Sequence, residues 1–107
     1  MKVIVLIMLF LTLSVGLAVA AGDAAAGKAV YDKTCKTCHG PTGVANPNIV
    51  KMMKVEIKDL GSTEVQKMSD ADLKAIVTAG KSKMKPVKSL AGKDVDNVVA
   101  YVRSLKE

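Results

Sequence analysis

The stretch Cys35-Lys36-Thr37-Cys38-His39 decides how this sequence is interpreted. It contains both cysteines and the single histidine of the 107-residue chain. A disulfide between Cys35 and Cys38 would close a very short loop, so it would restrict little of the unfolded chain. We therefore expect the two thiols and the neighbouring imidazole to act together on a group that the protein binds.

Three chemistries use cysteines at this spacing. Two such thiols can form thioethers with neighbouring vinyl groups on one porphyrin edge, and the histidine that follows is then carried beneath the iron. A thioredoxin-like dithiol usually opens a helix after a strand, whereas here a helix is predicted before the cysteines. A structural zinc site needs four ligands, and Cys35, Cys38 and His39 supply three. The sequence therefore favours one covalently attached haem c, with a dithiol oxidoreductase as the second interpretation.

Residues 1–20 have the pattern of a secretory signal peptide. Lys2 supplies the positive start, an apolar run follows it, and Ala18-Val19-Ala20 offers the small residues of a cleavage site. The apolar run is marginal for the roughly 20 residues that a membrane span needs. We expect cleavage after Ala20, which leaves one domain over residues 21–107. That domain is expected in the periplasm (or in an equivalent thylakoid-lumen or extracellular space), not embedded in the membrane.

The part after the predicted signal is poor in large side chains. It has no Trp and no Phe, so Tyr31 and Tyr101 are its only aromatic residues. A domain of 87 residues buries too little surface for a large core. We expect a bound cofactor to supply the missing apolar centre. The formal charge of the whole chain is +6, but export argues against a nucleic-acid partner, and a monomer is the default.

The hydrophobic pattern predicts helices joined by loops and no strand–helix–strand unit. Asp23 and Ser69 are placed as N-caps, Pro47 as a first helical residue and Gly80 as a helix end. We therefore predict an all-α fold of about four helices wrapped around one haem. The predicted helices cover residues 24–34, 47–53, 70–79 and about 93–105, with loops at 38–48 and 81–90.

A second iron ligand would have to be a methionine, because no further histidine exists. Met52, Met53 and Met68 are interpreted as core residues, Met68 as a contact beside the Ser69 cap. Met84 differs because it lies in an irregular lysine-rich loop that Pro86 would stiffen. We expect Met84 to be the distal ligand. A haem enzyme or gas sensor with a labile distal ligand is the alternative.

Lysines flank both the cysteine motif and Met84. If these two segments frame the exposed haem edge, their charges would attract a redox partner with an acidic docking surface. The simpler interpretation is a solvated lysine-rich surface with no docking role. The lysines are Lys33, Lys36, Lys81, Lys83, Lys85 and Lys88.

Three motifs together resemble class I c-type cytochromes. They are Gly27-x-x-x-Tyr31-x-x-x-Cys35-x-x-Cys38-His39-Gly40, the Lys-Met84-Lys-Pro86 loop, and Val98-Val99-Ala100-Tyr101-Val102 in the last helix. The likeness is to small bacterial monohaem cytochromes of the c553/c551 kind, and it covers nearly the whole chain after the signal. It implies a soluble electron carrier, not an enzyme, in which His39 and Met84 are the axial ligands.

The resemblance also implies structural roles. Gly27 would allow a close approach of the first and last helices, with Tyr31 and Tyr101 near their crossing. The Pro47 carbonyl would accept the hydrogen bond of the His39 imidazole. Two departures are evident: no Trp is available to contact a haem propionate, and residues 50–67 match nothing in the family pattern.

Overall fold

A computed structural model describes residues 22–90 and 92–107 of the chain. The predicted signal peptide and its cleavage site lie outside these residues. The described part contains six helices and no strand, apart from one isolated bridge between Lys81 and Met84. The all-α prediction is confirmed. The helices are α1 (Ala24–Thr34), α2 (Lys36–His39), α3 (Pro47–Met53), α4 (Thr63–Gln66), α5 (Asp70–Ala79) and α6 (Gly92–Ser104).

Helices α1, α3 and α5 begin where the sequence places a cap or a first helical residue. The Asp23 carboxylate accepts hydrogen bonds from the Ala25 and Ala26 amides at 2.9 and 3.3 Å. The Ser69 hydroxyl accepts one from Asp72 at 3.1 Å, which starts α5. These bonds satisfy amides that have no partner within the helix. The single-turn helices α2 and α4 were not predicted, since four residues are too few to show a helical period.

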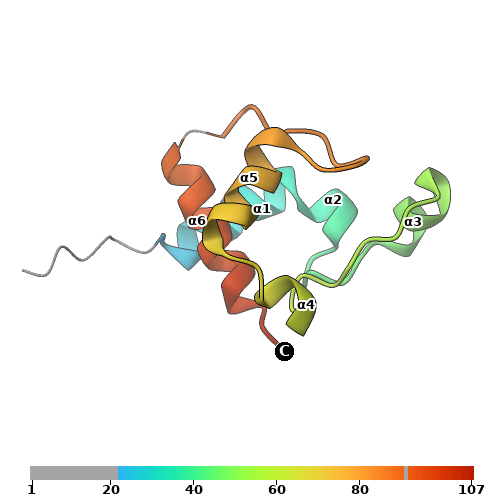
Figure 1. The fold of residues 1–107 in the computed structure, drawn as a ribbon, viewed down its shortest axis with the longest axis horizontal. Coiled ribbons are helices and arrows are strands. Elements are labelled where there is room, and N and C mark those ends of the chain that lie inside the picture. Colours follow the sequence, from blue (N-terminus) through green and yellow to red (C-terminus); the bar gives the residue numbers. More distant parts are fainter. Residues whose placement is uncertain (1–21, 91) are drawn as a thin grey trace, which may run out of the picture.

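Helices α1 and α6 cross in close contact (Figure 1). A Cβ atom on Gly27 would lie 1.9 Å from the carbonyl oxygen of Asn97, so only glycine fits at the crossing. The rings of Tyr31 and Tyr101 pack beside it, with their centroids 4.9 Å apart. Asn97 is buried, and its side-chain oxygen accepts a hydrogen bond from the Asp23 amide at 2.9 Å. The roles expected of the glycine and the tyrosines are confirmed.

The buried core is small and centres on one face of α6. Val99 is buried on that face against Leu73 of α5 and Val65 of α4, and Val98 of the same helix is buried as well. Met68, interpreted from the sequence as a core residue beside the Ser69 cap, packs on the same cluster. Val95, Val98, Val99 and Val102 thus form a valine stripe on α6, part of which packs against α4 and α5.

Helix α3 stands apart from α1, α5 and α6 (Figure 1). Its residue Met52 is 71% exposed, so the interpretation of Met52 as a core residue is wrong. The helix begins at Pro47 and ends at Lys54, which has a left-handed φ of 52°. No described helix is long and apolar enough to cross a bilayer.

We predict that Gly27→Ala destabilises the fold, because the added methyl group would overlap the Asn97 carbonyl. The expected loss in the free energy of unfolding is at least about 1–3 kcal/mol, measured by guanidinium denaturation. Ala29→Gly, on the exposed side of α1, is the control and should cost only about 1 kcal/mol through helix propensity. Alanine is the better helix former, so a Gly27→Ala protein as stable as the wild type would contradict the close approach.

Candidate functional site

A cavity of about 490 Å³ lies between the cysteine motif, α5, α6 and the loop that follows α5. Its size falls within the range of about 300–1,000 Å³ that small-molecule and cofactor sites occupy. Aliphatic side chains form most of its wall, so the cavity suits an apolar group. These side chains are Val55, Ile57, Leu60, Val65, Leu73, Ile76, Val77, Val98, Val99 and Val102.

The cysteine motif lines this cavity with both thiols and the imidazole. Cys35 follows α1, its amide bonded to the Tyr31 carbonyl at 2.9 Å. The His39 amide binds the Cys35 carbonyl at 3.0 Å, which closes the single turn of α2. Cys38 and His39 are therefore helical, and the loop expected from residue 38 begins only after His39. Both cysteines are free thiols.

Burial shifts the pKa values of Cys35 and His39. It raises the pKa of the Cys35 thiol and lowers the pKa of the His39 imidazole. A neutral imidazole is the form that binds a metal ion. The Nδ1 atom of His39 is buried without a hydrogen-bond partner, which is unusual for a polar atom. Two thiols, a neutral imidazole and an apolar wall around one cavity fit a haem of the c type.

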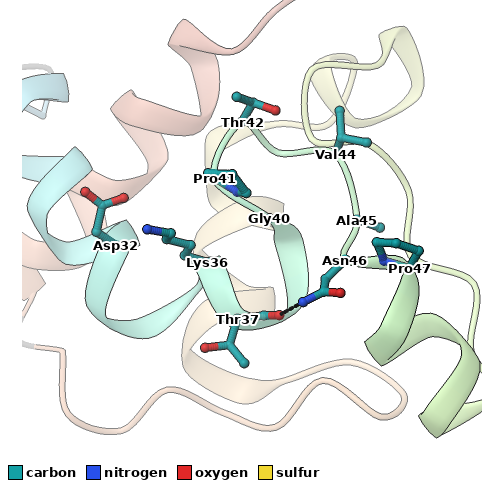
Figure 2. Close-up of a pocket in the computed structure, with 10 residues that line it drawn as sticks. All are labelled: Asp32, Lys36, Thr37, Gly40, Pro41, Thr42, Val44, Ala45, Asn46 and Pro47. Atoms are coloured by element: carbon teal, nitrogen blue, oxygen red, sulfur yellow. Dashed lines mark hydrogen bonds between the residues drawn. The ribbon is translucent and has the colours of Figure 1, made fainter.

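The structure does not form the expected hydrogen bond between His39 and the Pro47 carbonyl, because His39 Nδ1 has no partner. Pro47 lines a different hollow, of about 630 Å³, together with residues of the segment 40–46 (Figure 2). Asn46 fastens this segment to α2, through its side-chain amide to the Thr37 carbonyl at 3.1 Å. Pro47 begins α3, and only the last residue of that helix, Met53, lines the cavity of the cysteine motif.

Met84 lines the same cavity as His39. A tight turn presents it there: the Lys81 and Met84 amides each bind the other residue's carbonyl at 2.9 Å. Ser82 within the turn has a left-handed φ of 53°. A Cβ atom on Gly80, whose φ is 79°, would lie 2.7 Å from the Met84 carbonyl oxygen. The backbone thus allows little freedom in where Met84 is placed.

Two other methionines also line the cavity, namely Met53 and Met68. Met68 packs against the buried core cluster of Val65, Leu73 and Val99. Met53 is the last residue of α3, and its carbonyl accepts a hydrogen bond from Lys83 Nζ at 2.6 Å. This contact connects α3 to the turn that carries Met84. The structure therefore brings both the predicted ligand Met84 and Met53 to the cavity.

Comparison with known proteins identifies the family. The profile described as "Cytochrome C oxidase, cbb3-type, subunit III" matches residues 22–102. The cytochrome c-554(547) of Halothiobacillus neapolitanus is 35% identical over 91 residues, which are 80% of this chain and 100% of that protein. This chain is a small class I c-type cytochrome. Proteins of this class carry electrons with haem iron, which sets aside the dithiol and zinc interpretations of the motif.

Two further relatives agree with this assignment. The cytochrome c6 of Rippkaea orientalis (strain PCC 8801 / RF-1) is 35% identical over 92 residues, covering 81% of this chain and 75% of that one. The solved structure named KustC0563 c-type cytochrome superposes with a TM-score of 0.64 at 27% identity. That match covers 76% of this cytochrome and 98% of the solved chain.

Part of the stretch of residues 50–67, which matches nothing in the family pattern, contributes to the site of this cytochrome. Val55, Glu56, Ile57 and Lys58 all line the cavity; Val55 and Ile57 are half-buried, whereas Glu56 and Lys58 are exposed. Lys58 also pairs with Glu64 at the start of α4. Such an alternation of apolar and charged residues predicts an extended segment that buries one of its two sides. Sequence reasoning missed it because the stretch carries no motif.

Tyr31 connects α1 to the end of the cysteine motif. Its ring is fully buried, and its hydroxyl donates a hydrogen bond to the Gly40 carbonyl at 2.5 Å. Gly40 is buried and has a left-handed φ of 73°. The phenol therefore fixes the point at which the chain leaves α2 and turns away from the cavity.

We predict that Tyr31→Phe lowers the free energy of unfolding of the cytochrome by about 1–3 kcal/mol at neutral pH, because the Gly40 carbonyl loses its donor. Denaturant unfolding measures the loss. Tyr101→Phe is the matched control, since it keeps the paired rings, and it should change stability by less than about 0.5 kcal/mol.

The same variant should show a pH dependence. Burial raises the pKa of Tyr31 from 10.0 to about 12. The neutral phenol contributes fully to stability at a pH below the ordinary pKa of tyrosine. This contribution is lost as the pH rises through the raised pKa of Tyr31 in the folded protein. The stability difference between wild type and Tyr31→Phe should be constant up to about pH 10 and narrow above it. A difference that does not narrow would show that the phenol ionises equally in the folded and unfolded chains.

Proposed function

We propose that this cytochrome transfers single electrons through one haem c that is bonded covalently to Cys35 and Cys38, with His39 and Met84 as axial ligands. One observation carries the proposal: the two thiols, the imidazole and the Met84 thioether all line a single apolar cavity. No other described cavity gathers this donor set.

Each residue has a separate task in this arrangement. When bound, the haem iron supplies a one-electron couple. Cys35 and Cys38 hold the group at one edge, at the junction of α1 and α2. His39 binds in its neutral form, which its burial favours. Met84 approaches from the turn after α5. Two protein ligands leave no open position for a substrate, which suits a carrier and not an enzyme.

The cavity wall favours the reduced state. An apolar surrounding disfavours the additional charge of the oxidised centre, and a thioether ligand acts in the same direction. We assign the distal position to Met84 over Met53 because a constrained turn presents Met84. Met53 ends a helix that stands apart from the bundle.

Charge around the site suits an acidic redox partner. Six lysines flank the cysteine motif and Met84, and all six are exposed. None of them takes part in a salt bridge within residues 22–90 and 92–107. We propose that they form the docking surface of a monomeric, exported carrier, and that electron-transfer rates fall as salt is added. Rates independent of salt would contradict the docking role. The lysines are Lys33, Lys36, Lys81, Lys83, Lys85 and Lys88.

Covalent attachment is tested by mass. We predict that the protein, exported from a host able to attach haem, has the mass of the polypeptide after Ala20 plus one haem. The Cys35→Ser, Cys38→Ser double variant should lose this addition and should be largely unfolded, because the apolar centre is then missing. Circular dichroism measures the helix content. A wild-type product with bare peptide mass would overturn the proposed function.

The distal ligand is tested by absorption. Met84→Ala should abolish the far-red sulfur-to-iron band and allow carbon monoxide to bind. Met84→His should keep two protein ligands but lower the midpoint potential, since a second imidazole stabilises the reduced state less than a thioether does. Met53→Leu and Met68→Leu are the matched controls and should keep the band.

Two outcomes would change the assignment of the distal ligand. If Met84→Ala keeps the far-red band, another methionine is the ligand. Rapid binding of carbon monoxide or cyanide by the wild type would instead favour a haem enzyme or gas sensor with a labile distal ligand.

A further inference from the structure

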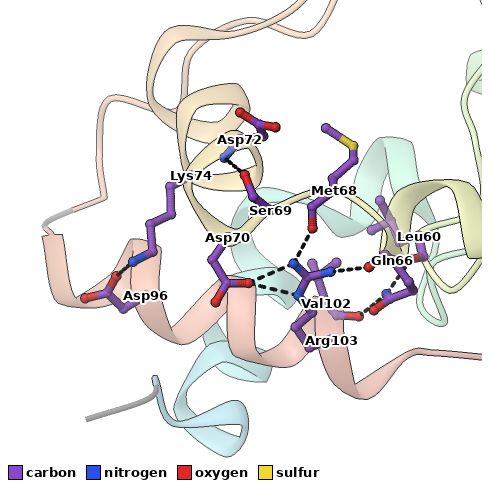
Figure 3. A network of polar contacts seen from close by, with 10 residues as sticks. All are labelled: Leu60, Gln66, Met68, Ser69, Asp70, Asp72, Lys74, Asp96, Val102 and Arg103. Atoms are coloured by element: carbon purple, nitrogen blue, oxygen red, sulfur yellow. Dashed lines mark hydrogen bonds and ion pairs between the residues drawn. The ribbon is translucent and has the colours of Figure 1, made fainter. Parts of the chain in front are cut away.

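Arg103, near the end of α6, binds a segment that follows α4. Its guanidinium donates hydrogen bonds to the Gln66 carbonyl at 2.9 Å and to the Met68 carbonyl at 2.5 Å (Figure 3). It also binds the Asp70 carboxylate through Nε at 2.9 Å and Nη2 at 2.8 Å. One half-buried side chain therefore joins three residues that lie 33 to 37 positions away in the sequence.

Gln66 extends this contact toward the cavity. Its side-chain amide donates to the Leu60 carbonyl at 2.8 Å and to the Val102 carbonyl at 3.0 Å (Figure 3). The Glu107 amide binds the adjacent Gly61 carbonyl at 3.0 Å. The end of α6 thus holds the chain at both sides of α4.

The two carbonyls that Arg103 binds, those of Gln66 and Met68, have no backbone donor within a helix. Helix α4 has only four residues, so the carbonyl of its last residue, Gln66, has no acceptor role within the helix. The Met68 carbonyl lies just before the Ser69 cap of α5. Arg103, from a distant position in the sequence, therefore supplies these two carbonyls with donors that secondary structure does not.

The residues held in this way form one wall of the haem cavity. Leu60, Val65, Met68 and Leu73 all line it, and all lie within or next to the bound segment. Their positions depend on the contacts of Arg103 and Gln66, because α4 is too short to be stable alone. A planar guanidinium suits this task, since its forked donors can bind several acceptors at fixed angles, which an ammonium group cannot reproduce.

We propose that Arg103 is a positioning residue of the cytochrome. It holds the wall from Leu60 to Leu73 against the haem and thereby raises the midpoint potential of the haem. The inference rests on the proposed function, because the wall acts on the haem that Cys35 and Cys38 attach. Arg103 itself does not line the cavity. It acts through Gln66 and Met68, by keeping water away from the apolar side of the site.

The test is potentiometry of the holoprotein together with amide hydrogen exchange. Arg103→Gln should lower the midpoint potential and speed exchange over residues 60–73 by about tenfold or more, because local opening becomes easier. Arg103→Lys keeps the charge but loses the fork, so it should lower the potential in the same direction. Gln66→Met removes the inner pair of contacts without changing the charge, and serves as an independent variant if Arg103→Gln does not accumulate.

Lys74→Gln is the matched control. It removes one positive charge and the ion pair of Lys74 with Asp96, which joins α5 to α6 at 2.6 Å, but it touches no carbonyl of the wall. Its potential and its exchange over residues 60–73 should equal those of the wild type. A drop in potential as large as that of Arg103→Gln would show an effect of charge alone and would overturn the proposal.

Other results would distinguish a failure of this inference from a failure of the proposed function. A wild-type potential in Arg103→Lys would assign the effect to charge and overturn the positioning role. Unchanged potential and exchange in both Arg103→Gln and Gln66→Met would do the same. A wild-type protein without attached haem would overturn the proposed function, whereas a normal haem protein with unaffected variants would overturn this inference alone.

Discussion

The structure depends on an apolar cavity that the polypeptide does not fill by itself. Six hydrophobic residues form the buried core of the described chain, and only Tyr31 among them is large. The helices surround the cavity with aliphatic side chains that would otherwise face water. Exposing such a surface is costly at roughly 25 cal/mol per Å². The arrangement of helices therefore makes sense only with an apolar group in the centre, and the cysteine motif provides the means to hold one.

The two sides of the cavity are built in different ways. On one side, the crossing of α1 and α6 is rigid, because Gly27 brings the backbones into contact and Tyr31 fixes the exit from α2. On the other side, the Met84 turn and the segment around α4 have little regular structure. Specific polar contacts stabilise them instead, among them those of Lys83 and Arg103. The site thus combines a fixed edge for attachment with walls that side chains hold in place.

Much of the fold could be predicted from the sequence because its signals are local. Asp23 and Ser69 cap helices through residues two or three positions away, and the valine stripe of α6 repeats within one helix. The motif around Cys35 likewise needs only five residues. Each of these features acts over distances at which spacing in the sequence still determines geometry in space.

Features that depend on distant contacts were harder to predict. Met52 was expected in the core, but α3 stands apart from the bundle and leaves it exposed. The contacts of Arg103 join side-chain donors to backbone carbonyls, and a carbonyl carries no residue type that could reveal it as a partner. The distal ligand was predicted on the composition of its loop, and the structure adds the turn between Lys81 and Met84 that supports that choice.

The contact between α1 and α6 affects how the two cysteines of this protein are used. It joins Asp23 to Asn97, which are 74 positions apart, so the intervening chain is closed into a ring by helix packing alone. Many small domains use disulfide bonds for such closure. Here a glycine, two tyrosines and a buried asparagine perform it, and neither thiol is consumed. Both thiols of the chain thereby remain available for the proposed attachment of haem.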